Sequence, residues 1–263
     1  MGLLLAIDVG NTNIVLGAFD LDQGQNGPLL HSWRIATTRE RTADEYGLMF
    51  QELLRHRKIE PSLVSEMAIA SVVPPIQPVL ETCCLRYFDA DPLWLEPGIE
   101  LGLKLLIDNP NELGADRIAN CVGVLEKYGA PAIAIDLGTA TTFDVVNGQS
   151  EYVGGLILPG VKIAAEALFH RAARLPRVEI AKPENIIGKN TIEAMQSGLY
   201  YGGISQMDGI LERLAQHVPG AAVIATGGLA KTIAKESRFI QQVEPDMTLY
   251  GLRCIWHRNR RAK

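Results

Sequence analysis

The chain has 263 residues, 47% of them hydrophobic and 21% charged, with a formal net charge of −5. This length suits one or two globular domains, and the negative charge argues against a general nucleic-acid binder. Asp8 interrupts the first apolar run, which therefore predicts neither a signal peptide nor a membrane span. The four cysteines lack metal-ligand spacing and do not suggest a secreted disulfide scaffold. We expect a cytoplasmic protein with no membrane or nucleic-acid partner.

Residues 3–17, LLLAIDVGNTNIVLG, join two apolar runs through a short polar turn. The pattern predicts a β-hairpin with the carboxylate of Asp8 at its mouth. Gly10 lets the backbone approach a ligand closely, and the amides and hydroxyls that follow can donate to phosphate oxygens. Asp8 then suits a Mg²⁺ ion lying between its carboxylate and the phosphates. The alternative is ordinary turn chemistry, in which Asx side chains bond their own backbone.

A second copy of this motif favours the ligand-binding interpretation. The sequence AIDLGT at 134–139 repeats AIDVGN at 6–11 about half a chain further along, again after an apolar run and before a β-rich stretch. Two strand–Asp–x–Gly–turn units predict a duplicated domain with a nucleotide bound between the halves.

The rest of the first half predicts a mixed sheet with helices packed against it. Residues 29–36, 67–73 and 92–95 are strand candidates, and residues 76–88 are a helix candidate. Thr42 and Glu45 form a capping box for a helix whose apolar positions fall on one face. Those positions are Tyr46, Met49, Phe50, Leu53 and Leu54.

Residues 108–117 (DNPNELGADR) predict a loop before a helix over 118–127, and Asp116 stands at the expected N-cap. Two interpretations stay open. Asp116 can simply cap the helix. Alternatively it faces a substrate hydroxyl, with a pKa lowered by neighbouring donors and Arg117, and accepts a proton from an alcohol that attacks phosphorus.

The second half begins with a strand at 130–135 and a threonine-rich turn, Asp136 to Thr142. Two more strands joined at Asn147–Gly148, a helix over 161–171 and a loop over 175–189 follow. Asn190 or Thr191 is expected to cap a long helix. A strand at 221–225 leads into Thr226–Gly227–Gly228, which suits either a flat ligand such as adenine or a tight turn. A helix over 249–256 is expected to close the chain.

Taken together, these motifs resemble those of the type III pantothenate kinases, in the family's order and over nearly the whole chain. The segments that carry the resemblance are 8–12 (DVGNT), 114–117 (GADR), 136–142 (DLGTATT), 154–160, 188–191 (GKNT) and 226–228 (TGG). The resemblance implies two tandem ribonuclease-H-like domains of the actin-like ATPase superfamily, which we expect at 1–113 and 114–263.

The resemblance also implies an activity, the transfer of the γ-phosphoryl group of ATP to pantothenate at the start of coenzyme A synthesis. Asp116 would be the general base. ATP would contact Thr139 and the phosphate-binding turn formed by Asp8, Val9, Gly10, Asn11, Thr12, Asn13, Ile14 and Val15. Pantothenate would contact Ile107, Gly114, Ala115, Asp116, Arg117 and Thr191.

By the same resemblance Asp136 would bind a monovalent cation, K⁺ or NH₄⁺, and the enzyme would be a homodimer whose partner chain supplies Thr191. One position departs from the family. Ile107 stands where a tyrosine is usual, so a hydroxyl and an aromatic face are lost beside pantothenate.

Two other functions stay open. One is a regulatory relative that keeps the nucleotide-binding fold without turnover, against which the joint presence of Asp8, Asp116, Arg117 and Asp136 argues. The other is a phosphotransferase or phosphatase of the same superfamily that acts on a different small molecule.

Overall fold

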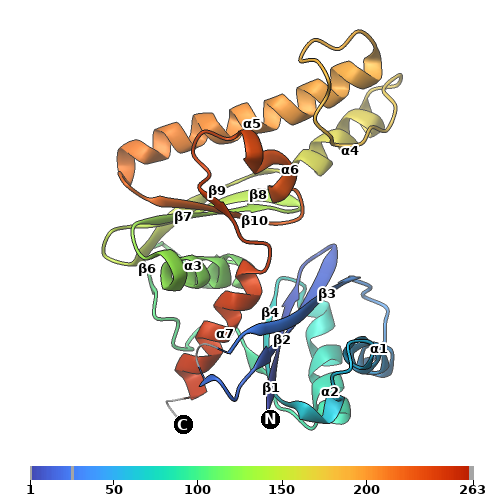
Figure 1. Cartoon of the computed structure of the whole chain (residues 1–263), viewed down its shortest axis with the longest axis vertical. Helices are drawn as coiled ribbons and strands as arrows, with labels where there is room; N and C mark the ends of the chain where they lie inside the picture. The colour runs from blue at the N-terminus through green and yellow to red at the C-terminus, as the bar shows by residue number, and fades with distance from the viewer. Residues whose placement is uncertain (1, 25–26, 261–263) are drawn as a thin grey trace. The chain divides into compact units, whose positions relative to one another are not determined.

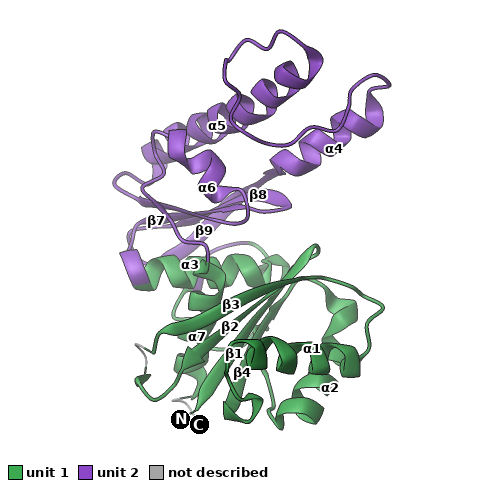
Figure 2. Ribbon diagram, turned by 45° about the vertical axis from the view of Figure 1, so that its right-hand side comes forward, with its two compact units in different colours: residues 1–103, 108–126, 246–263 green, residues 104–107, 127–245 purple. Residues whose placement is uncertain are grey.

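The computed structural model describes residues 2–24 and 27–260 of the chain. It is an α/β protein with two mixed sheets and flanking helices, as predicted (Figure 1). The chain forms two compact units, coloured separately in Figure 2. Unit 1 comprises residues 1–103, 108–126 and 246–263, and unit 2 comprises residues 104–107 and 127–245.

Unit 1 is built on a five-stranded sheet in the order β3-β2-β1-β4-β5. Its central strand β1 pairs with β2 in antiparallel and with β4 in parallel. The strands are β1 (Leu3–Val9), β2 (Asn13–Asp20), β3 (Leu29–Ala36), β4 (Val64–Ser71) and β5 (Leu93–Trp94).

Unit 2 repeats this topology. Its six-stranded sheet has the order β11-β10-β7-β8-β9-β6, in which β7 pairs with β8 in antiparallel and with β10 in parallel. The predicted duplication is therefore confirmed, with β7 in the position of β1. The strands are β6 (Lys104–Leu105), β7 (Ala132–Leu137), β8 (Ala140–Val146), β9 (Glu151–Pro159), β10 (Ala222–Thr226) and β11 (Gln242–Val243).

Helices cover both faces of the unit 1 sheet, which explains why β1 is continuously apolar from Leu3 to Ile7. Side chains at alternate positions, including Leu5 and Ile7, belong to a core with Tyr46 and Phe50 of α1 (Ala43–His56). Helix α2 (Gln77–Phe88) lies beside α1, and α7 (Met247–Arg260) packs on β1 from the opposite face (Figure 1). The predicted capping box of α1 is present.

Three helices belong to unit 2, namely α4 (Val161–Arg171), α5 (Thr191–His217) and α6 (Ala230–Ile233). Of the two predicted caps for α5 the structure has Asn190, whose Oδ1 accepts the N–H of Glu193 at 3.0 Å. Leu199, Tyr200 and Ile204 of α5 share a core with β7 and β8. Short 3₁₀ turns lie at Pro61–Leu63, Pro74–Ile76, Pro110–Glu112 and Ala234–Glu236.

The compact units do not coincide with the ranges 1–113 and 114–263 expected from the sequence. Most of α3 (Ala115–Tyr128) and all of α7 belong to unit 1. These two helices meet closely, because a Cβ at Gly251 would overlap the backbone of Ala119 and one at Gly123 would lie 2.9 Å from the carbonyl oxygen of Met247. Sequence order alone cannot reveal this return of the chain. Where the two ancestral domains divide stays a prediction.

The chain passes from unit 1 to unit 2 after Glu126 and returns after Pro245. Close to both crossings, Lys127 Nζ and Tyr128 Oη donate to Oε1 of Glu244. Burial raises the pKa of Glu244, but these two donors outweigh it and hold that pKa below its usual value. The carboxylate thus ties the beginning and the end of the long unit 2 segment to each other.

Two whole-chain expectations can be compared with the structure. No helix within residues 2–24 and 27–260 is both long and apolar enough to cross a membrane. Cys83, Cys84 and Cys121 are buried free thiols, and Cys254 is a partly buried one. Burial raises the pKa of Cys83 to about 12, so this thiol stays protonated and unreactive at neutral pH.

Candidate functional site

The β1–β2 hairpin forms as predicted and presents its polar turn to solvent. The N–H of Gly10 donates to the carbonyl of Asn13 at 2.9 Å, which closes the turn, while Asn11 and Thr12 at its tip are exposed. Asp8 lies one residue before the end of β1 and is half-buried, with its Oδ1 shielded from solvent. The turn therefore has exposed side chains at its tip and a carboxylate at its base.

Asp116 is not the N-cap of its helix, contrary to the simpler of the two sequence interpretations. Helix α3 begins at Ala115, and the N–H of Ile118 donates to the carbonyl of Gly114 at 3.1 Å. Gly114 thus takes the capping position, and Asp116 falls inside the first turn. The N-cap explanation for a carboxylate at 116 is thereby removed.

The pKa of Asp116 is also shifted in the direction opposite to the one expected. Burial raises it above the ordinary value of 3.8. The N–H of Arg117, which donates to Oδ1 at 2.8 Å, and the positive charge of Arg117 act against this rise without cancelling it. A carboxylate whose pKa lies nearer to neutrality is a stronger base, which favours the proton-accepting role.

Within unit 1 the turn and Asp116 lie at the same end of the sheet. The N–H of Val72, just after β4, donates to the carbonyl of Val9 at 3.0 Å. A Cβ at Gly114 would lie 3.5 Å from Cγ1 of Val72 and 2.6 Å from Oδ1 of Asp116. The carboxylate is thus near the carboxyl ends of two parallel strands, where open α/β sheets bind ligands.

Unit 2 assembles a second polar centre at the matching end of its own sheet. Asp136 near the end of β7 pairs in register with Thr226, the last residue of β10. Gly227 follows with φ +94°, and a Cβ there would overlap Oδ1 of Asp136. A Cβ at Gly138 would lie 3.1 Å from the same oxygen. The two glycines therefore allow the backbone to pack closely against this carboxylate.

The oxygen-rich composition of both centres suits hard cations. Asp8 and Asp136 each bring a carboxylate oxygen shielded from solvent, and Thr139 lies exposed in the turn after Asp136. Among the residues that the structure describes, no three His, Cys, Asp or Glu side chains are grouped so as to hold a metal ion. Any cation here would depend on one carboxylate together with phosphate, carbonyl, hydroxyl or water oxygens, as Mg²⁺ commonly does.

The remaining predicted contacts fall on separate elements. Ala115 is buried and Arg117 half-buried in the first turn of α3. In unit 2, Ile107 is half-buried just after β6, and Thr191 is the exposed first residue of α5. Thr191 lines an open cavity of about 480 Å³ between α4 and α5, whose other walls are Leu168, Leu175, Ala194, Met195, Gly198 and Leu199.

The sequence interpretation missed two residues that contact the turn. Thr37 donates its hydroxyl to the carbonyl of Gly10 at 2.6 Å, and Nη2 of Arg39 donates to Oδ1 of Asn11 at 3.4 Å. The signal available was the polar stretch Thr37–Arg41, with two arginines between the third strand and the capping box. Its proximity to the turn follows from the pairing of β2 with β3.

Comparison with known proteins agrees with these motifs. A family model described as type III pantothenate kinase matches residues 4–213. The chain is 48% identical to the type III pantothenate kinase of Koribacter versatilis, over 98% of this chain and 96% of that one. It is 49% identical to the proteins of the same name from Exiguobacterium sibiricum, over 98% and 100%, and Geobacillus kaustophilus, over 99% and 100%.

Solved structures show the same fold at low sequence identity. One is a conserved putative Baf family transcriptional activator from Campylobacter jejuni, with TM-score 0.59 and 19% identity over 98% of this chain and 99% of that one. Another is the activator of 2-hydroxyisocaproyl-CoA dehydratase from Clostridium difficile with bound ADPNP, with TM-score 0.55 and 11% identity over 99% and 96%. On the family match and the near-full-length relatives, the chain belongs to the type III pantothenate kinases, enzymes that phosphorylate pantothenate with ATP at the start of coenzyme A biosynthesis.

Proposed function

We propose that Asp116 is the general base with which this kinase activates the primary hydroxyl of pantothenate. The observation that carries the proposal is the half-buried position of its carboxylate at the carboxyl end of the unit 1 sheet, with a pKa that burial raises. Proton transfer to a positioned carboxylate contributes roughly 10² to 10⁴ in rate. The hydroxyl oxygen would then attack the γ-phosphorus of ATP in line with the leaving ADP.

The turn Asp8–Val15 is proposed to hold the phosphates of ATP. Its tip is exposed, and Gly10 allows close approach of the backbone. Asp8 would hold Mg²⁺ indirectly through water, and the ion, when bound, would neutralise charge on the phosphates. Because phosphate and water oxygens would fill the other coordination positions of Mg²⁺, Asp8 need not belong to a cluster of carboxylates.

Asp136 and Thr139 are proposed to form the second phosphate and cation site. The close approach of backbone to the shielded Oδ1 of Asp136, which Gly138 and Gly227 allow, supports a bound monovalent cation, K⁺ or NH₄⁺, held by this oxygen together with others. Thr139, exposed in the same turn, would donate its hydroxyl to ATP. Substituting sodium for potassium would then lower turnover without affecting the fold.

Pantothenate is a carboxylate, and Arg117 is the cation of the Gly114–Arg117 segment that would receive it. Gly114 and Ala115 would line the same pocket through their backbone. Ile107 would contribute apolar contact, and Thr191 a hydroxyl. These assignments follow the order of the family motifs and the chemistry of the substrate.

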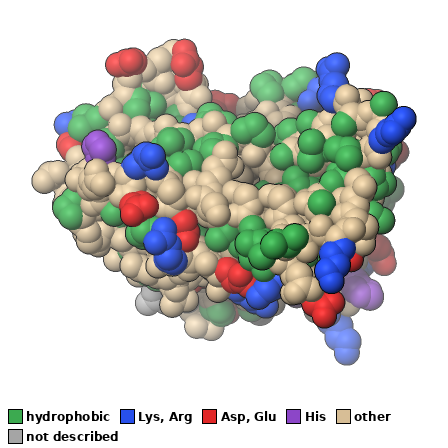
Figure 3. Space-filling view, turned by 90° about the horizontal axis from the view of Figure 1, so that it is seen from above, with side chains coloured by type: hydrophobic (Ala, Val, Ile, Leu, Met, Phe, Trp, Pro, Cys, Tyr) green, Lys and Arg blue, Asp and Glu red, His purple; other side chains and the backbone are tan. Residues whose placement is uncertain are grey.

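A homodimer is supported by the apolar surface of α4, α5 and the loop between them. Ile163 and Leu168 are each 39% exposed, and Ile186, Ile187 and Ile192 are 65%, 77% and 51% exposed. Figure 3, which views this end of unit 2 from above, has hydrophobic side chains spread among polar ones. Large apolar side chains left exposed on neighbouring elements favour a protein–protein interface there. We also expect the enzyme to work in the cytoplasm, where its thiols stay reduced.

The test is ATP turnover measured with and without pantothenate, in Mg²⁺ with either potassium or sodium as the salt. Pantothenate-dependent turnover that requires potassium is the expected result. Folded protein that binds ATP but turns over under neither salt would instead favour a regulatory role. Turnover that depends on another alcohol would favour a changed substrate.

A further inference from the structure

The segment Thr37–Arg41, here called the strap, runs from the end of β3 to the start of α1 and lies against the β1–β2 turn. The N–H of Thr37 donates to the carbonyl of Thr12 at 3.0 Å, and its hydroxyl donates to the carbonyl of Gly10 at 2.6 Å. A single strap residue thus bonds the turn on both sides of Asn11. The position of the strap relative to the turn is fixed by these two bonds.

Arg39 lies at the middle of the strap and points its guanidinium at the tip of the turn. Its Nη2 donates to Oδ1 of Asn11 at 3.4 Å, a long bond to a neutral acceptor, and both side chains are exposed. Residues 8–15 of the turn contain no Lys or Arg. The cationic group at this tip therefore comes from the strap.

The second arginine of the strap is engaged elsewhere. Nη1 of Arg41 is 3.5 Å from the carbonyl of Ala36 and 3.8 Å from Sδ of Met49, and its guanidinium lies 5.7 Å from the ring centroid of Tyr46. Arg41 thus packs back onto β3 and α1. The two arginines, two residues apart, have different surroundings.

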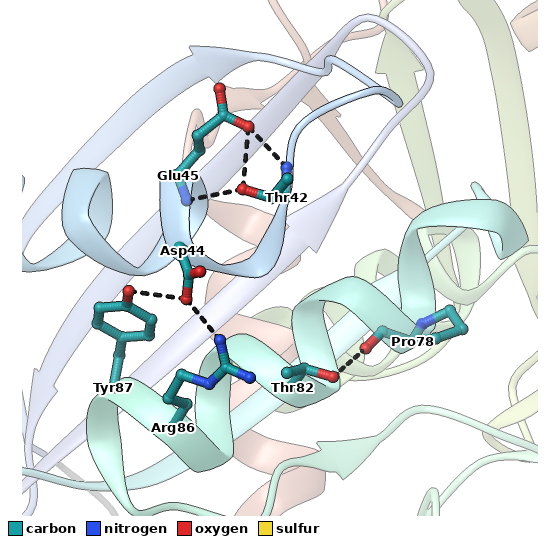
Figure 4. A network of polar contacts seen from close by, with 7 residues as sticks. All are labelled: Thr42, Asp44, Glu45, Pro78, Thr82, Arg86 and Tyr87. Atoms are coloured by element: carbon teal, nitrogen blue, oxygen red, sulfur yellow. Dashed lines mark hydrogen bonds and ion pairs between the residues drawn. The ribbon is translucent and has the colours of Figure 1, made fainter.

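Thr38, which directly precedes Arg39 in the strap, is anchored to α1. The hydroxyl of Tyr46 donates to the carbonyl of Thr38 at 2.7 Å and lies 3.3 Å from the N–H of the same residue. Tyr46 is fully buried, so this anchor belongs to the core of unit 1. The capping box of Thr42 and Glu45 then starts the helix (Figure 4).

Helix α1 is in turn held against α2. Asp44 accepts hydrogen bonds from Arg86 at 2.7 Å and from Tyr87 at 2.9 Å (Figure 4). Gly47 faces the ring of Tyr87 so closely that a Cβ at 47 would overlap it. The backbone that carries Arg39 is therefore supported at both ends before any ligand binds, which lowers the entropy lost on binding.

We propose that Arg39 is a phosphate-binding residue of the ATP site, which exchanges Oδ1 of Asn11 for a phosphate oxygen of the nucleotide. The exchange replaces a long bond to a neutral amide by a charge-assisted bond to an anion. The proposal rests on the assignment of the turn 8–15 to the ATP phosphates. It adds a cation to a turn that otherwise offers only neutral donors and the Asp8 carboxylate.

The test compares Arg39→Gln with Arg57→Gln, in which the altered arginine is also exposed but follows the other end of α1. Affinities for ATP, ADP and adenosine are measured by calorimetry at two salt concentrations, with thermal melting as the check on folding. Arg39→Gln is expected to weaken ATP binding about tenfold, as loss of a bond to a charged group does, and to leave adenosine unchanged. Its ATP affinity should also depend less on salt. Arg39→Lys should recover part of the loss, and Arg57→Gln should match the parent.

Equal ATP-to-adenosine ratios in Arg39→Gln and the parent would overturn the proposal. Thr12→Glu, which adds a negative charge at the exposed tip, separates the two ways of failing. If Thr12→Glu weakens ATP binding while Arg39→Gln does not, the turn holds phosphate without Arg39. If neither variant changes the ratio, the assignment of the turn falls as well.

Discussion

Gly227 and Asp136 approach each other so closely that residue 227 has no room for a side chain. Gly227 has φ +94°, and a Cβ there would overlap Oδ1 of Asp136 and lie 2.6 Å from the carbonyl carbon of Leu137. Gly228, the next residue, has nothing within 4 Å of the corresponding point. Position 227 thus requires glycine, whereas position 228 has room for a side chain.

Gly227→Ala should therefore impair both the fold of unit 2 and turnover, whereas Gly228→Ala should impair neither. The overlap with Asp136 and the left-handed backbone together are expected to cost at least about 1 kcal/mol, and to displace the carboxylate from the proposed cation site. Urea unfolding and turnover in saturating potassium measure the two effects. Similar behaviour of the two variants would contradict this account of the pair.

Asp116→Asn should reduce kcat by roughly 10² to 10⁴ and leave ATP affinity nearly unchanged, because an amide cannot accept the proton. In the parent, the acid limb of the pH–rate profile should lie above the range of an ordinary aspartate, because burial raises the pKa of Asp116. Asp91→Asn, at an exposed site outside the proposed machinery, is the control. A kcat for Asp116→Asn equal to that of the parent would exclude the base assignment.

The same substitution should stabilise the fold at neutral pH. A carboxyl whose folded pKa is raised binds its proton more tightly in the native state, so stability falls as pH rises from 3.8 through that folded pKa. The amide that replaces the carboxyl in Asp116→Asn carries no such penalty, and its oxygen can still accept the N–H of Arg117. Chemical denaturation at pH 3 and pH 7.5 should give similar stabilities at the lower pH and a more stable variant at the higher one. A less stable variant at pH 7.5 would mean that the ionised carboxylate is held by favourable interactions.

Ile107→Tyr, which restores the residue usual in the family, should tighten pantothenate binding if its hydroxyl reaches the substrate. One neutral hydrogen bond contributes about 0.5–1.5 kcal/mol, or roughly two- to tenfold in Kd. Leu106→Tyr adds the same group at the neighbouring exposed position and should have no effect. An unchanged Kd for Ile107→Tyr would indicate that position 107 serves packing alone.

Leu168→Asp should weaken the proposed homodimer, because it places a charge on the wall of the cavity between α4 and α5. Leu85→Asp replaces a similarly exposed leucine on α2 and should leave association unchanged. Sedimentation velocity over a range of concentrations distinguishes the two. A parent protein that sediments as a monomer at all concentrations would refute the dimer itself.

Local patterns predicted most of the helices and strands but not the short edge strand β11, whose two residues are defined by pairing with β10. The apolar runs of β1, β2 and β7 and the capping box at Thr42 each depend on residues close in sequence. The raised pKa of Asp116 depends on burial, which no local pattern encodes. The approach of Arg39 to Asn11 likewise requires two strands to pair first. Which helices join unit 1 was equally inaccessible, because α7 returns from the far end of the chain.

The Glu244 carboxylate accepts hydrogen bonds from Lys127 and Tyr128, and this contact bears on where the chain can be recombined with that of a relative. It brings the two ends of residues 127–245 together, as at the boundaries of an inserted domain, where insertion into a host chain is best tolerated. Together with a compatible β6, the strand of unit 2 that lies outside this stretch, residues 127–245 are thus suited to exchange as a cassette among relatives that keep the acceptor and both donors. A recombinant that kept only the donors or only the acceptor would lose the hydrogen bonds that hold residues 127 and 128 to residue 244.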